Sequence, residues 1–248
     1  MTKHSDNLFY SIKGFKIPYV TTGTSPFIGA GQFGAKGKKW RRMFLNDSRA
    51  MIKILKASYQ AGARGIEAIP LGGILKAAKK MKEIHTDYVI AGSTYPGRKS
   101  GINELIEAGA RLIFVHGMVS DRKGEKLINL VEKINSRGIL SGIATHDPIN
   151  TINHVRENKV QISSFLIPFN ATGKFMQDQE RLEAIVDETR EYSFIAMKTL
   201  AAGKIKPKDA FEYVGNHNID GASIGMVTEK QARESTQIAL KCLQKRKN

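Results

Sequence analysis

The sequence has few of the features that would place the protein in several common classes. It contains a single cysteine, Cys242, which excludes a disulfide framework within the chain and argues against a cysteine-rich metal site. No apolar run approaches the roughly 20 residues that a membrane-spanning helix needs. Residues 1–20 lack the compact apolar core and cleavage site of a secretory signal. We therefore expect a cytoplasmic protein that does not act at a membrane.

Acidic residues are scarce relative to basic ones, at 23 Asp and Glu against 39 Lys and Arg, which gives a formal net charge of +16. The basic residues gather at 36–42 (KGKKWRR), 76–82 and 241–247. The last two segments fall on predicted helices, where such residues usually form a solvated face. The first contains Trp40 and is predicted to be a loop, which makes it the best candidate to bind an anion. We expect a small anionic or carbonyl-containing metabolite as partner, and the charge leaves nucleic acid open as the alternative.

The sequence does have a repeated local pattern. The tetrapeptide AGAR occurs at 61–64 and 108–111, each time after a helical pattern and before an apolar strand, and SRGILSG at 136–142 repeats the arrangement. Alternating helix, glycine turn and apolar strand is typical of β/α units. Strands are predicted within residues 27–30, 61–70, 87–97, 111–117, 136–148, 161–170, 193–203 and 220–228. The pattern and the length of 248 residues predict an α/β fold, a single (β/α)8 TIM barrel over residues 1–248, with an N-terminal β-hairpin segment at 1–26.

In such a barrel the carboxyl ends of the strands converge at one face, where active sites form. His116 follows the apolar residues 112–115, so it either takes part in chemistry or only caps the strand. Lys198 either acts as nucleophile or acid with a lowered pKa, or pairs with a carboxylate such as Glu67, which is the commoner role. No closely spaced histidine motif supports a metal site, and we expect none. The other polar residues predicted at this face are Gln32, Ser93, Tyr95, His146, Asp147 and Asn170.

The segment GMVTEK at 225–230 opens the last predicted helix. Its backbone N–H groups and the helix dipole would face the same end of the barrel, with Thr228 as the cap and Lys230 beside it. We expect phosphate binding here.

The order of these motifs resembles the aldo/keto reductase family over most of the chain. LIFVHG (112–117) is similar to the family's histidine motif, SGIATHDP (141–148) to its turn after strand five, and MKTLAAG (197–203) to its strand-seven motif. SIGMVTEKQARES (223–235) resembles its nucleotide-phosphate segment. The resemblance implies a barrel preceded by a hairpin, NADPH as cofactor and His116 as the catalytic histidine. It also implies a set of cofactor-binding residues: Gly225, Met226, Thr228, Lys230 and Glu234.

The catalytic residues depart from the family pattern. EAIPLGG (67–73) stands where the family has D-T-A-x-x-Y-G, so Glu67 replaces the aspartate and Gly72 the proton-donating tyrosine. Ser93 stands where the family has a lysine, and Ser235 where an asparagine is usual. Carbonyl reduction needs an acid to protonate the developing alkoxide. The family reaction therefore cannot run in its usual form, and use of NADPH is in question.

Three functions remain open. Tyr95 and Lys198 could supply a relocated acid beside Glu67 and His116, which would make the protein a rebuilt reductase. The barrel could instead catalyse a non-redox lyase or isomerase step with His116 and Lys198 on an anionic substrate, or it could be a non-catalytic basic binding module. An enzyme of aldo/keto reductase-like descent ranks first. Its predicted catalytic residues are His116, Glu67, Lys198 and Tyr95, and its predicted substrate-binding residues are His146, Asn170, Gln32 and Trp40.

Overall fold

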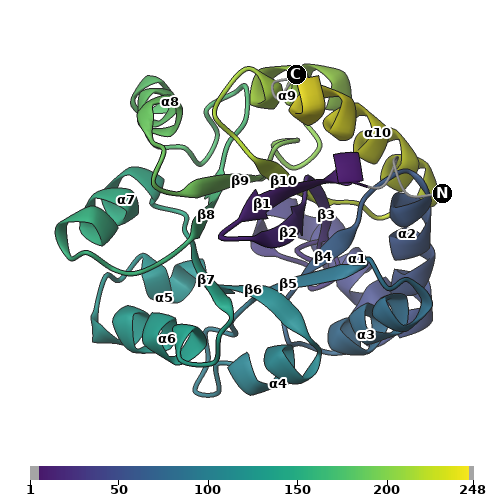
Figure 1. Ribbon diagram of the computed structural model, residues 1–248. Coiled ribbons are helices and arrows are strands. Elements are labelled where there is room, and N and C mark those ends of the chain that lie inside the picture. The colour runs from purple at the N-terminus through teal and green to yellow at the C-terminus, as the bar shows by residue number, and fades with distance from the viewer. Residues whose placement is uncertain (1–5, 246–248) are drawn as a thin grey trace.

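The computed structural model describes residues 6–245, and in it eight parallel strands close into a barrel, as the sequence predicts. The strands follow one another round the barrel in chain order, and the last one pairs with the first (Figure 1). They are β3 (Val20–Gly23), β4 (Gly65–Ala68), β5 (Val89–Ser93), β6 (Ala110–Val115), β7 (Leu140–Ala144), β8 (Ser164–Pro168), β9 (Ser193–Met197) and β10 (Gly221–Gly225).

Helices surround the barrel and bury their apolar stripes against it. They are α1 (Gly34–Phe44), α2 (Ser48–Gln60), α3 (Ile74–Ile84), α4 (Ile102–Glu107), α5 (Gly117–Ser120), α6 (Glu125–Asn135), α7 (Pro148–Glu157), α8 (Gln179–Glu188), α9 (Pro207–Gly215) and α10 (Glu229–Lys245). Two short 3-10 helices, η1 (Asp6–Leu8) and η2 (Gly31–Phe33), complete the list. Among residues 6–245 there is no helix with the length and apolar character to cross a membrane.

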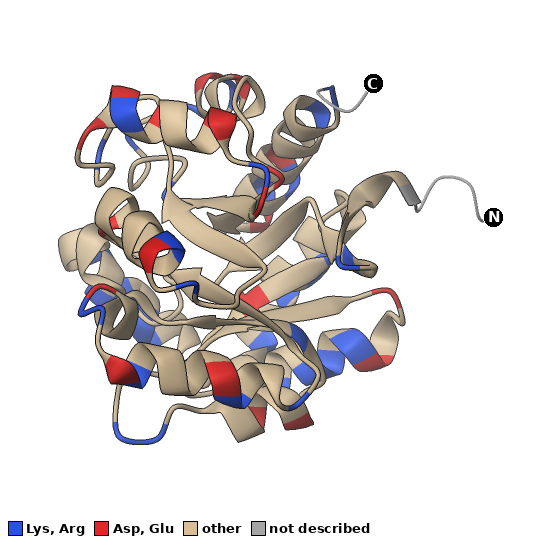
Figure 2. Cartoon of the chain, turned by 60° about the vertical axis from the view of Figure 1, so that its left-hand side comes forward, with Lys and Arg blue, Asp and Glu red and all other residues tan. Residues whose placement is uncertain are grey.

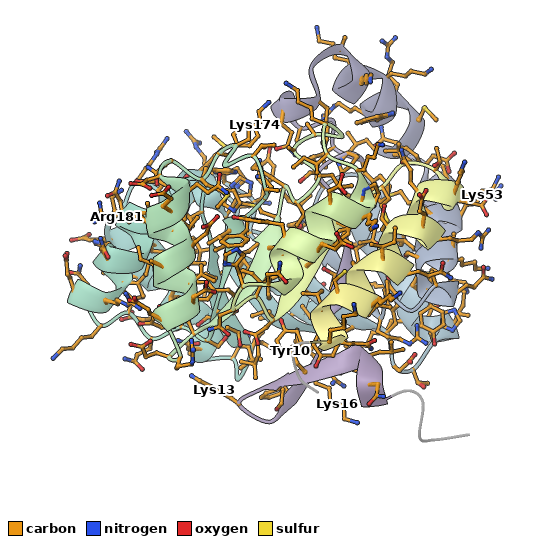
Figure 3. All side chains as sticks on the ribbon, turned by 90° about the horizontal axis from the view of Figure 1, so that it is seen from above. Tyr10, Lys13, Lys16, Lys53, Lys174 and Arg181 are labelled. Carbon is orange, nitrogen blue, oxygen red and sulfur yellow. The ribbon has the colours of Figure 1, made fainter. Side chains whose placement is uncertain are left out.

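An antiparallel hairpin of β1 (Phe9–Ile12) and β2 (Phe15–Pro18) covers one end of the barrel. Tyr10, Ile12 and Ile17 of the hairpin are buried. In the side view of Figure 3 the labelled Tyr10, Lys13 and Lys16 lie at this end, and Lys174, in the loop after β8, lies at the opposite end. The hairpin therefore closes the end where the strands begin, and the carboxyl ends of the strands open at the other.

The predicted first strand at residues 27–30 is wrong, because the first barrel strand is Val20–Gly23. This segment lies within the predicted N-terminal hairpin, 1–26, but it pairs with β4 and β10 of the barrel. Thr22 is fully buried there, and its hydroxyl contacts that of Ser58 at 2.9 Å. Residues 24–30 form turns instead, with Phe27 N–H donating to Thr24 O at 2.9 Å and Gly29 at a φ of 67°.

The basic segment 36–42, predicted to be a loop, is part of the helix α1. Its lysines and arginines favour helix, and the buried Phe44 fixes its last turn to the body of the protein. In Figure 3 this helix, in faint purple-blue, projects beyond the barrel at the end opposite the hairpin. In Figure 2 basic and acidic residues are interspersed on the outer helices visible in that view. α1 differs because it carries five exposed basic residues and no acidic one: Lys36, Lys38, Lys39, Arg41 and Arg42.

Candidate active site

A cavity of about 430 Å³ opens at the mouth, between the ends of β3, β4, β9 and β10 and the start of α10. Four residues predicted for the site line it: Gln32, Trp40, Glu67 and Lys198. Residues 199–200 and 202–207 form a further part of its wall, and Lys204 and Lys206 belong to that segment. The volume is within the range of small-molecule sites.

Lys198 directly follows β9 and lies on the wall of this cavity. Its Nζ donates a hydrogen bond to the side-chain oxygen of Gln32 and lies 4.9 Å from the centre of the Phe175 ring. The predicted pairing with Glu67 is wrong, because among residues 6–245 Lys198 forms no ion pair. Burial without a nearby negative charge lowers the pKa of Lys198 to about 8.

The backbone of Lys198 is also unusual, with a left-handed φ of 56°. Non-glycine residues adopt this conformation rarely, and such strain tends to occur at functional sites. Ala201 and Ala202, in the same loop, and Phe175, which faces the amine, have positive φ as well. The fold therefore holds Lys198 and these neighbouring residues in backbone conformations that they would rarely adopt by themselves.

Glu67, on β4, lines the same cavity as Lys198, and only 9% of it is exposed. Burial raises the pKa of its carboxyl group, and a hydrogen bond with Ser93 partly opposes the rise. The serine that occupies the position of the family's lysine thus contacts the carboxyl group that occupies the position of its aspartate. A carboxyl group with a raised pKa is suited to donate a proton.

His116 caps α5 at the end of β6. Its Nδ1 accepts a hydrogen bond from the backbone N–H of Met118 at 3.1 Å, so the neutral ring carries its proton on Nε2. Burial lowers the pKa of His116 to about 4. Electrostatic interactions with His146 and Lys198 act in the same direction, while that with Asp121 opposes them. At neutral pH His116 is therefore an uncharged N–H donor within electrostatic range of Lys198.

His146, at the end of β7, contacts a residue that sequence reasoning missed. Its Nδ1 lies 3.2 Å from Oδ2 of Asp121, in the loop after α5. The rings of His116 and His146 lie 6.3 Å apart. Asp121 follows β6 and α5, so its position at the mouth could have been predicted from the strand order. Its contact with His146 could not, because the two residues lie 25 positions apart and no sequence pattern links them.

Asp147 and Asn170 hold loops together. Asp147 accepts hydrogen bonds from Lys123 at 2.8 Å, Asn150 at 2.8 Å and Gln177 at 2.5 Å, and so joins three loops of the mouth. Asn170 is fully buried, and among residues 6–245 its side chain forms hydrogen bonds within the loop 170–174 that follows β8. Neither it nor the two histidines line the cavity that Lys198 faces, so the predicted residues divide into a cavity group and a neighbouring network.

The position of the missing tyrosine is closed to any side chain. Gly72 has a φ of 55°, and a Cβ there would lie 2.2 Å from the carbonyl oxygen of Leu45, which also accepts a hydrogen bond from Gly73 N–H. Tyr95, predicted as a replacement acid, is 38% exposed and does not line the cavity. Within the described part of the chain its hydroxyl forms no hydrogen bond with His116 or Lys198. The structure thus offers no tyrosine in the position that hydride transfer of the family type requires.

The predicted cofactor residues divide in the same way. Gly225, Met226 and Glu234 line the cavity. Thr228 caps α10 by accepting from Gln231 N–H at 3.2 Å, and Lys230 lies on an adjoining shallow surface. No group of three or more histidine, cysteine, aspartate or glutamate side chains suited to a metal ion occurs in residues 6–245.

Comparison with known proteins finds a shared fold. No protein-family profile matches the chain, and no curated protein matches it by sequence. A protein assigned as an aldo-keto reductase from Pseudomonas aeruginosa superposes with a TM-score of 0.70 and 14% identity, over 95% of each chain. A variant of Gox0644 in complex with NADPH superposes with a TM-score of 0.63 and 12% identity, over 96% of this chain and 93% of that one.

A 2-keto-3-deoxy-6-phosphogluconate aldolase of Zymomonas mobilis, solved with 3-phosphoglycerate, also shares the fold. Its TM-score is 0.55 at 18% identity, over 79% of this chain and 87% of the aldolase. These superpositions show that the chain shares its barrel fold with aldo-keto reductases, as the sequence predicts, and that an aldolase has the same architecture. Fold alone does not decide between such chemistries.

Proposed function

We propose that the protein catalyses a non-redox reaction of a small anionic carbonyl compound, in which Lys198 forms an imine with the carbonyl carbon. The observation that carries the proposal is the state of this amine: it faces the cavity, has no carboxylate partner among the described residues, and has its pKa lowered to about 8. At pH 7 about one such amine in ten is unprotonated, against about one in 2,500 for an ordinary lysine. Only the unprotonated amine attacks a carbonyl group.

The neighbouring groups suit the remaining steps of imine formation. Attack of the amine gives a carbinolamine, and loss of its hydroxyl group as water needs a proton. Glu67 lines the same cavity, and its raised pKa favours the protonated form that can supply this proton. His116 does not line the cavity, but it lies close enough to Lys198 for the charge of the amine to affect its pKa. In this proposal its neutral Nε2–H donates to the carbonyl oxygen of the bound substrate as negative charge develops there.

The charge distribution favours an anionic substrate. The five basic residues of α1 stand at the mouth without an ion pair to any described carboxylate, and Lys204 and Lys206 are on the cavity wall. Such a surface concentrates anions and speeds their arrival.

A dehydrogenase is the second candidate function. The cavity runs along the end of β10 to α10 beside Gly225, Met226 and Glu234, where the resemblance puts the nicotinamide cofactor, and a fold neighbour was solved with NADPH. Lys204 and Lys206 would then hold its phosphate groups. The cofactor would supply the hydride, but the protein would still need an acid where Gly72 stands, and we expect no NADPH oxidation with a panel of aldehydes and ketones.

Trapping tests the proposal. The protein is incubated with pyruvate, dihydroxyacetone or dihydroxyacetone phosphate and reduced with borohydride, and peptide mass spectrometry locates the adduct. We expect the adduct on Lys198, its loss in Lys198→Arg, and its retention in Lys123→Arg, which alters the lysine paired with Asp147 at the same mouth. Robust NADPH oxidation, or adducts spread over surface lysines without Lys198, would contradict the proposal.

A further inference from the structure

A carboxylate and an imidazole form a pair on the side of the mouth next to the Lys198 cavity. Asp121 Oδ2 and His146 Nδ1 lie 3.2 Å apart, and the carboxylate also accepts from the backbone N–H of His146 at 3.1 Å. The contact through Nδ1 leaves Nε2 as the ring atom that can take up or deliver a proton. In catalytic triads a carboxylate on one ring nitrogen has the same effect, because it fixes the orientation and stabilises the imidazolium.

The carboxylate of this pair is held firmly. The hydroxyl of Thr145 donates to Asp121 Oδ1 at 2.6 Å, and Thr145 is itself fixed by Thr151 at 3.0 Å and by the N–H of Asp147 at 2.9 Å. Burial alone would raise the pKa of Asp121, but the hydrogen bonds from His146 and Thr145 lower it overall. Asp121 is therefore ionised at neutral pH and keeps its position.

The imidazole ring of His146 is partly exposed to solvent and packs closely against the backbone of Gly117. The His146 side chain is 43% exposed, and its ring lies over the backbone of Gly117, where a Cβ would come within 2.5 Å of Nδ1. Any residue other than glycine at position 117 would displace the ring. The glycine thus allows the ring to approach the end of β6.

His116, His146 and Lys198 follow the ends of β6, β7 and β9, in the barrel order β6-β7-β8-β9. The ring centre of His116 is 6.3 Å from that of His146, and the charges of both His146 and Lys198 act on it. The three groups therefore belong to the same mouth, and the charge of Lys198 reaches the His116 ring that lies next to His146.

We propose that His146 is the general base and acid of the reaction, that Asp121 is its positioning residue, and that the substrates are β-hydroxy carbonyl compounds, which the enzyme cleaves to a ketone and an aldehyde. This inference rests on the imine chemistry proposed for Lys198.

The cleavage balances without a cofactor. The amine of Lys198, the substrate ketone and one proton from the Glu67 carboxyl group form a protonated imine and water. Nε2 of His146 removes the proton of the β-hydroxyl group, the bond between Cα and Cβ breaks, and Cβ leaves as an aldehyde. The electron pair of that bond forms the C=C bond of an enamine, and the former C=N pair moves onto nitrogen. His146 returns its proton to Cα. Water then hydrolyses the protonated imine to the ketone and the Lys198 amine, and the proton released returns to Glu67.

The same proton transfer can be observed without knowing the natural substrate. A ketone bound as an imine loses and regains its α-protons through the same base, so pyruvate and dihydroxyacetone should exchange their α-protons with deuterium in D₂O. Proton NMR measures this exchange, and borohydride trapping measures imine formation separately. The Asp121–His146 pair, called the dyad below, is needed for α-proton exchange and not for imine formation.

The experiment uses four proteins. We expect His146→Ala to keep the Lys198 adduct and to lose about 10²-fold in exchange rate, with partial recovery when imidazole is added to the solution. Asp121→Asn should lose about tenfold, and Asp147→Asn, which removes a neighbouring carboxylate without a histidine partner, should stay close to the wild type.

The outcomes separate the two proposals. Exchange that is unchanged in His146→Ala while the adduct forms would overturn the dyad and leave the imine chemistry intact. A loss of exchange that imidazole does not restore would point to a structural role for His146 and would also overturn the dyad. Absence of any adduct in the wild type would overturn the imine chemistry, and the dyad's role with it.

Discussion

Lys123 and Lys198, both at the barrel mouth, lie in opposite surroundings. Lys123 donates to Asp147 at 2.8 Å, within a network in which that carboxylate also accepts from Asn150 and Gln177. Lys198 contacts one amide oxygen and one aromatic ring. Burial would raise the pKa of Asp147, but its hydrogen bonds lower it overall, whereas burial lowers the pKa of Lys198 with nothing to oppose it.

The difference shows that the same end of the barrel contains a charged network that stabilises the loops and a cavity whose ionisable groups are suited to catalysis. The network around Asp147 keeps its groups charged and joins loops from three β/α units. The cavity side leaves Lys198 and Glu67 without opposite charges, so burial favours the uncharged amine and the protonated carboxyl group. Those are the forms that a nucleophile and an acid need.

Lys198→Met should produce the largest effect. We expect the borohydride adduct and α-proton exchange to fall to the background, at least about 10³-fold, since the nucleophile is gone. The variant should also unfold at a higher temperature, because the wild type holds a half-buried ammonium. Because the pKa of Lys198 is lowered in the folded state, the buried ammonium destabilises the wild type fully below pH 8 and no longer does so above the ordinary lysine pKa. The gain in Tm should therefore shrink as pH rises.

Lys123→Met is the control for this comparison. It removes the partner of Asp147, so we expect it to lower Tm while the adduct at Lys198 persists. Equal loss of adduct in the two variants would mean that the two lysines do not differ as described.

His116→Asn should come next. Removing a preoriented N–H donor to a developing oxyanion costs about 10²–10³-fold in rate, and we expect that loss in the rate of adduct formation with dihydroxyacetone. Because the pKa of His116 is about 4, its donor should act without change between pH 5.5 and 8. The assignment would be contradicted if the wild-type rate depended on a group that titrates near pH 6.5 and if this pH dependence were absent in His116→Asn.

Gly72→Ala should destabilise the fold by about 1–3 kcal/mol, because the left-handed backbone and the oxygen of Leu45 both exclude a Cβ. Gly73→Ala is a matched control, since its φ is −85° and its nearest neighbour is the flexible end of Met51 at 3.3 Å. Chemical denaturation measures both variants. Equal stabilities would show that a side chain, and hence a tyrosine, can be accommodated at position 72.

The smallest effect should come from the charge of α1. We expect Lys36→Glu combined with Lys39→Glu to raise the half-saturating concentration of dihydroxyacetone phosphate about 3–10-fold at low salt, and that of uncharged dihydroxyacetone little. Lys76→Glu with Lys79→Glu has the same charge change and spacing on α3, and should have little effect on either probe. Equal effects of the two double variants would show that α1 has no special part in attracting the anion.

The sequence predicted the barrel because its glycine turns and apolar strands repeat locally, and local signals also placed Lys198, Glu67 and His116 at strand ends. It could not predict what each group contacts. Lys198 and Gln32 are 166 residues apart, and Asp121 and His146 are 25 apart, so only the closed barrel brings them together. The first barrel strand falls inside the segment predicted as the N-terminal hairpin, because its pairing with β10, at the other end of the chain, has no local signal.

The pKa of Lys198 tests the central claim most directly. Its rate of reaction with acetic anhydride can be followed by peptide mass spectrometry from pH 6 to 11, with exposed Lys38 of α1 as the internal reference. We predict a midpoint near 8 for Lys198, which its burial without a carboxylate partner requires. A midpoint near the ordinary lysine value of about 10.4 would contradict the account, because Lys198 would then be a protonated structural lysine.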